Sequence, residues 1–241
     1  MSISKESIIG ELVANDYRTA PVFKKHNIDF CCNGNRSIAE ACEKKKIDSN
    51  DLIQQLEQAT SANNASSVDY NSWPLDLLAD YIEKKHHRYV ESRSQEIKPF
   101  LEKIIRVHGE RHPELIETGK LFNESVGELA MHMKKEELML FPFIRRMVKA
   151  EQDKTSVQAP FGSVQNPIKA MMHDHDGEGE RFRKIASLTN DYNPPADACN
   201  TCRVTFSMLK EFEEDLHLHI HLENNILFPK AISMEEKLAT V

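Results

Sequence analysis

The sequence predicts an all-α protein, in which an antiparallel four-helix bundle follows a small helical N-terminal domain. Three observations lead to this prediction: few helix-breaking residues, apolar residues at helical spacing, and a polar stretch that divides the chain. Only 8 glycines and 10 prolines occur in 241 residues, which favours helices over a loop-rich β-protein. Hydrophobic residues form 40% of the chain and charged residues 29%, so the protein can bury a substantial core.

Residues 1–60 are expected to form the small domain from short helices separated by turns. Ser37 is a predicted N-cap for a helix over 38–45. Ser49 or Asn50 is expected to cap the helix that follows.

A linker at 61–72 is expected next, because its first half holds small polar residues without periodicity. The bundle should then occupy 73–241, where apolar residues recur at steps of three, four and seven, as on one face of a helix. Pro99 and Pro142 fall inside this pattern and should kink or interrupt it. The predicted helical stretches are 74–107, 113–150, 165–190 and 197–232.

Composition and charge narrow the classes of function. With 31 basic and 38 acidic residues the formal net charge is -7, which argues against a nucleic-acid binder, because phosphate binding requires clustered Lys and Arg. No apolar run approaches the roughly 20 residues of a membrane span, and the N-terminus shows no signal-peptide core. We therefore expect a cytoplasmic protein with neither nucleic-acid nor membrane partners.

The pattern that indicates chemistry is a repeat, H-x-x-x-E-x-x-x-L-F-P, which begins at His132 and again at His219, 87 residues later. It indicates a duplicated helical hairpin. Residues four apart share one helix face, so each His points the same way as its Glu, Glu136 or Glu223. Both pairs continue apolar stripes, and a Glu directed into a core requires a positive partner. No Lys or Arg shares these stripes, so we expect a metal ion.

The first and third bundle helices should each supply one further ligand. The first offers His86 and His87, and the third offers His173 and His175. The pair His86 and His173 keeps the 87-residue offset of the repeat, and the offset alone does not choose between them. Either choice yields four imidazoles and two carboxylates, a set that suits two carboxylate-bridged metal ions and favours non-haem iron.

The remaining histidines and acidic residues are expected to have other roles. His217 and His221 lie about 200° round the helix from the repeat's histidine, so we expect them in solvent or behind the ligands. His108 and His112 fall in a loop and are expected to be structural. The acidic residues of 211–215 are expected to form a solvated face.

The five cysteines fit reduced thiols, since their number is odd and Cys31 is adjacent to Cys32. Cys42 lies on an apolar stripe and is expected in the core. Cys199 and Cys202 have the Cys-x-x-Cys spacing of metal or redox sites, but without a second pair the signal is weak.

Several strings together resemble the RIC (repair of iron centres) family, the YtfE/ScdA di-iron proteins. The resemblance covers nearly the whole chain and implies a small ScdA-type N-terminal domain before a hemerythrin-like bundle. The strings are Asp29–Gly34, Ser37–Ala41, Val107–Gly109, His112–Leu115, Leu222–Asn225 and Leu227–Pro229.

The resemblance implies one set of ligands to a non-haem di-iron centre, oxo-bridged when oxidised, in which the two Glu bridge the irons. Glu128 matches an acidic family position near the irons, and Asp174 stands where the family often has Glu. Cys202 stands where related sequences tend to have an aromatic residue, so its spacing from Cys199 looks accidental. The implied ligands are His87, His132, Glu136, His175, His219 and Glu223.

The function implied by the resemblance is repair of iron–sulfur clusters damaged by nitric oxide or oxygen species, by iron donation rather than by enzymatic turnover. Damaged iron–sulfur proteins would be the partners, and Cys31 and Cys32 on a mobile first domain would be redox or iron-transfer thiols. Two alternatives remain: reduction of nitric oxide to nitrous oxide, or a sensor or carrier that binds oxygen or nitric oxide. The sequence does not determine the oligomeric state, and a homodimer is one assembly that it allows.

Overall fold

The computed structural model describes residues 3–61 and 68–239, and all of its regular elements in these ranges are helical. The extended contact recorded within them is an isolated antiparallel bridge between Ile8 and Ser37. The predicted all-α class is therefore confirmed. The expected linker at 61–72 falls in part on residues 62–67, which lie outside the described ranges. None of the described helices combines the length and apolar character that a membrane span requires.

The small domain consists of short helices whose starts follow local capping chemistry. Ser37 caps α3 as predicted, and Glu40 completes a capping box by accepting a hydrogen bond from the Ser37 backbone. At the start of α4 the prediction was wrong, because the carboxylate of Asp48 accepts the backbone N–H of Asn50 instead. The elements are α1 (Ile9–Asn15), η1 (Tyr17–Thr19), α2 (Ala20–Lys25), α3 (Ile38–Lys45) and α4 (Ser49–Ser61).

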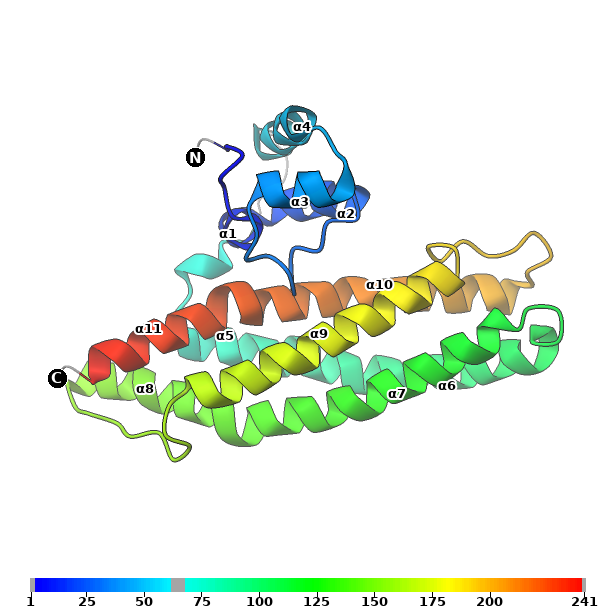
Figure 1. Ribbon diagram of the computed structural model, residues 1–241. Helices are drawn as coiled ribbons and strands as arrows, with labels where there is room; N and C mark the ends of the chain where they lie inside the picture. The colour runs from blue at the N-terminus through cyan, green and yellow to red at the C-terminus, as the bar shows by residue number, and fades with distance from the viewer. Residues whose placement is uncertain (1–2, 62–67, 240–241) are drawn as a thin grey trace.

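All four predicted helical stretches of the second part are present, and they run antiparallel along one long axis (Figure 1). The last stretch continues six residues beyond its predicted end. The elements of the whole second part are η2 (Tyr70–Ser72), α5 (Leu75–Tyr81), η3 (Ile82–His87), α6 (Arg88–His108), α7 (Glu114–Lys135), η4 (Glu136–Leu140), α8 (Phe141–Asp153), α9 (Gln165–Leu188), α10 (Asn200–Leu222), η5 (Glu223–Leu227) and α11 (Phe228–Leu238).

Three of the four stretches contain a π-helical turn within the described residues, namely η3, η4 and η5. Pro142, one of the two prolines expected to disturb the helices, follows η4 in the first turn of α8, whereas Pro99 lies within α6. A proline has no N–H to continue the α-helical ladder, so it fits a point at which the hydrogen-bonding register changes. Single π-turns in α-helices occur frequently at functional sites.

Buried apolar side chains form two separate clusters in the described parts of the chain. The first, which we call the proximal core, joins the small domain to α6, α7, the second half of α9 and α10. Phe212 lies at its centre, with ring centroids 5.3 Å from Phe122 and 5.7 Å from Phe182. The second, the distal core, joins α5, α8, the start of α9 and α11. The polar residues described below lie between them along each stretch.

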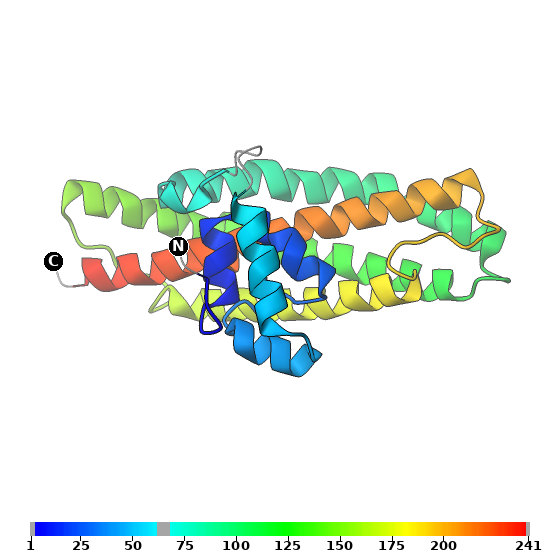
Figure 2. The same cartoon turned by 90° about the horizontal axis from the view of Figure 1, so that it is seen from above.

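The small domain is seated on the side of the bundle formed by α9 and α10, near the middle of its length (Figures 1 and 2). The amide Nδ2 of Asn225 donates to the carbonyl of Phe30 at 3.0 Å. Arg183 of α9 pairs with Asp29 at 3.0 Å. The loop that carries the vicinal cysteines is thereby fixed against the bundle.

Candidate metal centre

The six side chains that the resemblance implied as ligands meet inside the bundle, and each is at most 3% exposed. His87 ends η3, while Glu136 and Glu223 begin η4 and η5. The remaining members are His132 on α7, His175 on α9 and His219 on α10. Every bundle stretch therefore contributes to the cluster, and all three π-turns described above hold one of its members.

The donor atoms form two sets that share both carboxylates. One set consists of His87, Glu136, His219 and Glu223, and the other replaces the two histidines by His132 and His175. In each set the candidate ligand atoms lie within 4.8 Å of one another. Two overlapping sets of this kind suggest a binuclear metal site, and both carboxylates belong to both sets.

Distances between the donor atoms of the cluster are compatible with their binding a common metal ion. The Nε2 atoms of His132 and His175 lie 3.0 Å apart. Two nitrogens bound at about 2.1 Å and at right angles to one ion would be about 3.0 Å apart. Each carboxylate also approaches a histidine from its own helix turn, with Nε2 to oxygen distances of 3.3 Å at both His132–Glu136 and His219–Glu223.

Buried atoms without hydrogen-bond partners test whether the residues suit a metal. Both carboxylate oxygens of Glu136 and of Glu223 have no hydrogen-bond partner among the described residues, and the same holds for Nε2 of His87 and of His219. Leaving several such atoms unsatisfied in a core is costly. Two cations bound between these atoms would satisfy them, so the residues suit a binuclear metal site.

Three of the four imidazoles are oriented by an acceptor on their other nitrogen. His87 Nδ1 lies 3.1 Å from Glu137, His132 Nδ1 lies 3.3 Å from Asp174, and His175 Nδ1 lies 2.9 Å from Asn224 Oδ1. An acceptor at Nδ1 holds the proton there and leaves the Nε2 lone pair for a metal.

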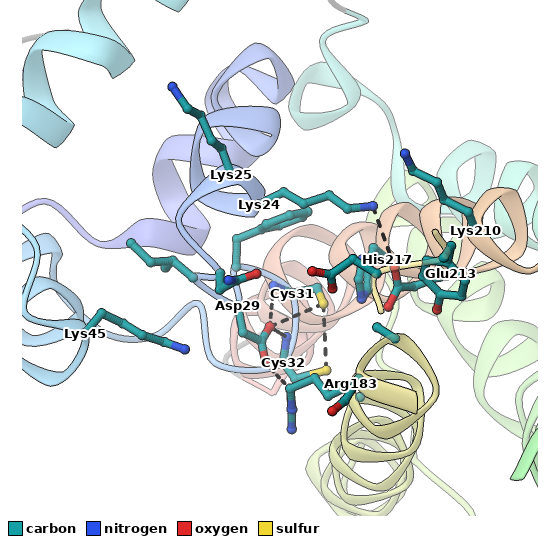
Figure 3. Close-up of a pocket in the computed structure, with 18 of the residues that line it drawn as sticks. Lys24, Lys25, Asp29, Cys31, Cys32, Lys45, Arg183, Lys210, Glu213 and His217 are labelled. Carbon is teal, nitrogen blue, oxygen red and sulfur yellow. Dashed lines mark hydrogen bonds and ion pairs between the residues drawn. The ribbon is translucent and has the colours of Figure 1, made fainter. Parts of the chain in front are cut away.

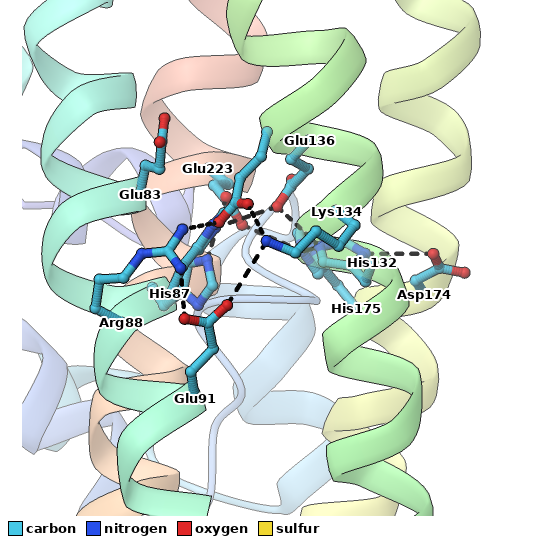
Figure 4. A network of polar contacts seen from close by, with 12 residues as sticks. Glu83, His87, Arg88, Glu91, His132, Lys134, Glu136, Asp174, His175 and Glu223 are labelled. Carbon is cyan, nitrogen blue, oxygen red and sulfur yellow. Dashed lines mark hydrogen bonds and ion pairs between the residues drawn. The ribbon is translucent and has the colours of Figure 1, made fainter.

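Salt bridges hold the acceptor carboxylates in turn. Glu137 is bound by Arg88 and, at 2.6 Å, by Lys134. Asp174, which lies beside His132 (Figure 4), is bound by Lys135 at 3.2 Å. Glu137 and Asp174 therefore each lie between a histidine of the cluster on one side and Lys or Arg side chains on the other.

Charge–charge interactions dominate the ionisation of the metal-free cluster. Burial raises the pKa of Glu223, but His219 and His175 outweigh it and hold that pKa well below its usual value. Burial lowers the pKa of His132, but Glu136 and Glu223 reverse this and raise it to about 9. The carboxylates are therefore ionised and ready to bind cations, and a proton on an imidazole partly replaces the missing positive charge.

The structure distinguishes the alternatives that the 87-residue offset left open. His173 is exposed on α9 and lies outside both donor sets. His86 is buried but also outside them, since its Nδ1 bonds Asp215 at 3.0 Å and its ring stacks on His219 at 5.6 Å. His86 therefore packs against the ring of His219 without belonging to either donor set.

Two expectations about acidic residues require correction. Glu128 is not part of the cluster, since its side chain is 64% exposed and pairs with Arg181 at 2.9 Å. Glu213 was expected on a solvated face, yet it is only 6% exposed, and burial raises its pKa. Lys24 of the docked small domain approaches Glu213 to 3.7 Å, whereas Glu211 and Glu214 of the same stretch are exposed as expected.

His217 and His221 face the small domain rather than the metal cluster. The His221 ring is 1% exposed, and its centroid lies 6.0 Å from that of Phe30. Burial lowers its pKa to about 3 and that of His217 to about 4, so both are neutral. Of the two expected positions, solvent or behind the ligands, the first is wrong for His221, because the sequence pattern of one helix does not show what covers it.

The vicinal cysteines lie beside the metal cluster. Cys31 is buried, and its sulfur lies 3.8 Å from that of Cys32. The Cys32 thiol donates to the backbone carbonyl of His175 at 3.4 Å, and Asn224 Nδ2 donates to the carbonyl of Cys31 at 3.1 Å. The hydrogen-bond contact with Cys32 and burial raise the pKa of the Cys31 thiol well above its usual value, so Cys31 is a protonated thiol at rest.

A cavity of about 750 Å³ opens beside these two thiols, at the junction of the small domain and the bundle (Figure 3). Both cysteines line it together with several cationic side chains. The cations are Lys24, Lys25, Lys45, Arg183 and Lys210.

Sequence reasoning missed two residues that support the cluster, Glu137 and Asn224. Each directly follows a carboxylate that belongs to both donor sets, at the second residue of η4 or η5. The available signal was the position itself, since a polar residue next to a buried ligand is placed to bond a neighbouring ligand.

Comparisons with known proteins agree with this geometry. Residues 5–60 match the ScdA_N model, described as a domain of unknown function, and residues 78–231 match the hemerythrin HHE cation binding domain. The iron-sulfur cluster repair protein ScdA of Staphylococcus haemolyticus is 32% identical over 229 residues, covering 95% of this chain and 99% of that protein. The iron-sulfur cluster repair protein YtfE of Musicola paradisiaca is 33% identical, covering 96% and 98%, and that of Yersinia pestis is 34% identical, covering 94% and 97%.

Proposed function

The chain belongs to the ScdA and YtfE family of iron–sulfur cluster repair proteins, and we propose that it repairs damaged clusters with iron held in its bundle. Its second part is a hemerythrin HHE cation-binding domain with a binuclear metal site. Damaged iron–sulfur proteins follow as its targets.

We propose iron as the metal at both positions. Imidazole and carboxylate donors suit iron, and carboxylate-bridged di-iron sites are built inside other helical bundles. In this assignment His87 and His219 would hold one ion, His132 and His175 would hold the other, and both Glu would be shared. The bound pair would supply transferable iron and exchangeable positions for small oxygen or nitrogen-oxide ligands.

The route outward is proposed to lead through Cys31 and Cys32. Thiolates bind iron well, and Cys32 already contacts the backbone of His175 at 3.4 Å. Both thiols line the cavity, whose five cationic and three carboxylate side chains leave a net positive charge that would attract an acidic partner surface. A dithiol between a metal cluster and an open cavity is suited to passing iron to a damaged cluster.

One observation carries the proposal: two donor sets sharing Glu136 and Glu223 lie next to a docked dithiol. The test is to replace His132 and Glu136 together by Ala, and separately Cys31 and Cys32 together by Ser. We expect the first variant to lose both iron and repair, and the second to retain iron and lose repair. Iron per chain and reactivation of a nitric-oxide-damaged [4Fe–4S] dehydratase are the two measurements. Reactivation by the iron-free variant would contradict the proposal.

The same experiment distinguishes iron donation from reduction of nitric oxide. Donation consumes the bound iron, so the iron content of the protein should fall as the target regains activity. Nitrous oxide formed over many turnovers at constant iron content would instead favour the enzymatic alternative.

A further inference from the structure

A second sulfur site lies far from the metal centre, where the α6–α7 and α9–α10 connections meet at one end of the bundle (Figure 1). Cys199 is exposed there, directly before the first residue of α10. His108, the last residue of α6, places Nε2 at 3.1 Å from Cys199 Sγ. This contact joins two segments 91 residues apart.

The contact of His108 with Arg111 determines which of its ring nitrogens carries the proton. Arg111 directs Nη2 at His108 Nδ1, 3.3 Å away. A guanidinium only donates, so Nδ1 accepts, and the ring proton of the neutral imidazole lies on Nε2. The imidazole N–H therefore donates to the sulfur of Cys199. Arg111 is itself held by Asp197 at 2.7 Å, which keeps the arrangement in place.

Two features favour the thiolate of Cys199. The hydrogen bond from His108 lowers its pKa, and backbone N–H groups of Cys202 and Thr201 lower it further, to about 7. Those groups belong to the positive end of α10, a helix of 23 residues, where a thiolate is stabilised. The other charged neighbours of this pair of thiols are Arg203, Asp197 and Glu114.

Cys202 has the complementary properties. It is 1% exposed, and burial raises its pKa, so it remains a protonated thiol. Cys199 is the N-cap of α10 and Cys202 is its third residue, so the two cysteines lie within the first turn of the helix. An exposed, acidic thiol one turn before a buried thiol is the arrangement of reactive Cys-X-X-Cys sites.

We propose that Cys199 and Cys202 form a thiol–disulfide exchange site for low-molecular-weight disulfides. The Cys199 thiolate attacks one sulfur of the small disulfide, the disulfide bond breaks, and one thiolate leaves. The Cys202 thiol then gives up its proton and attacks Cys199 Sγ, which releases the second half as a thiol. Starting from the Cys199 thiolate, the protein loses two electrons and the Cys202 proton as it forms one disulfide, and the small disulfide gains them as one thiolate and one thiol.

The test uses the full-length, metal-loaded protein with glutathione disulfide as the oxidant. After incubation the protein is denatured, free thiols are blocked with iodoacetamide, and the chain is digested with trypsin. Peptide 185–203 contains both cysteines and no others, so its mass reports on this pair alone. We expect the wild-type peptide to lose two hydrogens and escape alkylation, whereas Cys202→Ser should accumulate a glutathione adduct on Cys199. A wild-type peptide that stays reduced, or that accumulates the same adduct, would overturn the proposal.

His108 is tested as the residue that activates the thiol. His108→Gln should slow alkylation of Cys199 at pH 7 by about threefold or more and move the midpoint of the rate–pH profile above 7. His112→Gln is the matched control. His112 lies at the same end of the bundle and contacts Asp197 and Glu114, but it does not contact the thiol. Equal alkylation rates in the His108 variant and in wild type would overturn the role of His108.

Discussion

His175 Nδ1 lies 2.9 Å from Asn224 Oδ1, and this contact links the metal cluster to the small domain. Asn224 uses its other amide atom to donate to the carbonyl of Cys31 at 3.1 Å. An amide oxygen only accepts, so the ring proton of His175 lies on Nδ1, and Nε2 is free to bind a metal. One side chain therefore orients a ligand and holds the dithiol loop.

Asn224→Ala is expected to weaken metal binding by about 10- to 100-fold, because the tautomer and orientation of His175 are no longer fixed. The matched control is Asn225→Ala, which removes a bond to Phe30 in the same interface but touches no cluster member. Iron affinity against a competing chelator measures the difference. Equal losses in the two variants would show that docking, rather than orientation of His175, determines affinity.

Metal binding is expected to release a proton from His132 at neutral pH. The pKa of this residue is about 9 in the metal-free cluster, so it binds a proton there that the metal must displace. Apparent affinity should therefore rise with pH up to about 9. Calorimetric titration at pH 7 in buffers of different ionisation enthalpy gives the number of protons released, and a value of zero would contradict the prediction.

The same shift predicts how the stability of the metal-free protein depends on pH. The folded pKa of His132 lies above its unfolded value of 6.5, so its contribution is complete below pH 6.5 and is lost as pH rises towards 9. The melting temperature of the metal-free protein should fall across this range. The metal-loaded protein should change less, because a bound ion replaces the proton.

Gly34→Ala is expected to displace the cysteine loop while the bundle keeps its metal. A Cβ there would lie 2.3 Å from the carbonyl oxygen of Phe30, which is backbone and cannot move aside cheaply. Gly127→Ala is the control, since a Cβ on that helical residue meets nothing within 4 Å. We expect faster hydrogen exchange around Cys31 in the first variant alone, with unchanged iron content in both.

Phe212→Ala is expected to destabilise the protein by about 3–5 kcal/mol, because a fully buried ring packed against other aromatic rings is removed. Leu138→Ala removes an apolar side chain that is 74% exposed and should change stability by less than about 0.5 kcal/mol. Urea unfolding of both variants against wild type measures the two changes. Similar losses in both would contradict the assignment of Phe212 to the core.

Much of the bundle and most of the cluster could be predicted, because both depend on local periodicity. The step of four residues in the repeat places His132 beside Glu136 whatever the rest of the chain does. The choice between His86 and His87 could not be derived from the offset. The two hairpins have connections of unequal length, at 109–113 and 189–199. The π-turn η3, which ends at His87, also changes the helical register of the first helix at the cluster, so the 87-residue offset does not carry over to this ligand.

The failures concern contacts between distant segments. Glu213 was expected in solvent, and His221 in solvent or behind the ligands, because the periodicity of α10 carries no information about the small domain that covers them. The role of Asn224 could not be predicted, since it requires His175 and Cys31 to be adjacent in space.

The separation of the bundle into proximal and distal cores has a thermodynamic consequence. In the described residues the layer of His and Glu side chains separates the two apolar cores, so bound metal ions would add a cross-link between halves that the continuous helical stretches already join. With metal, the bundle should melt as one cooperative unit, with equal calorimetric and van't Hoff enthalpies. Without metal, the two halves should be coupled less tightly, so the melting transition should broaden and the van't Hoff enthalpy should fall below the calorimetric enthalpy. Reduced cooperativity of melting would then be a measure of metal loss.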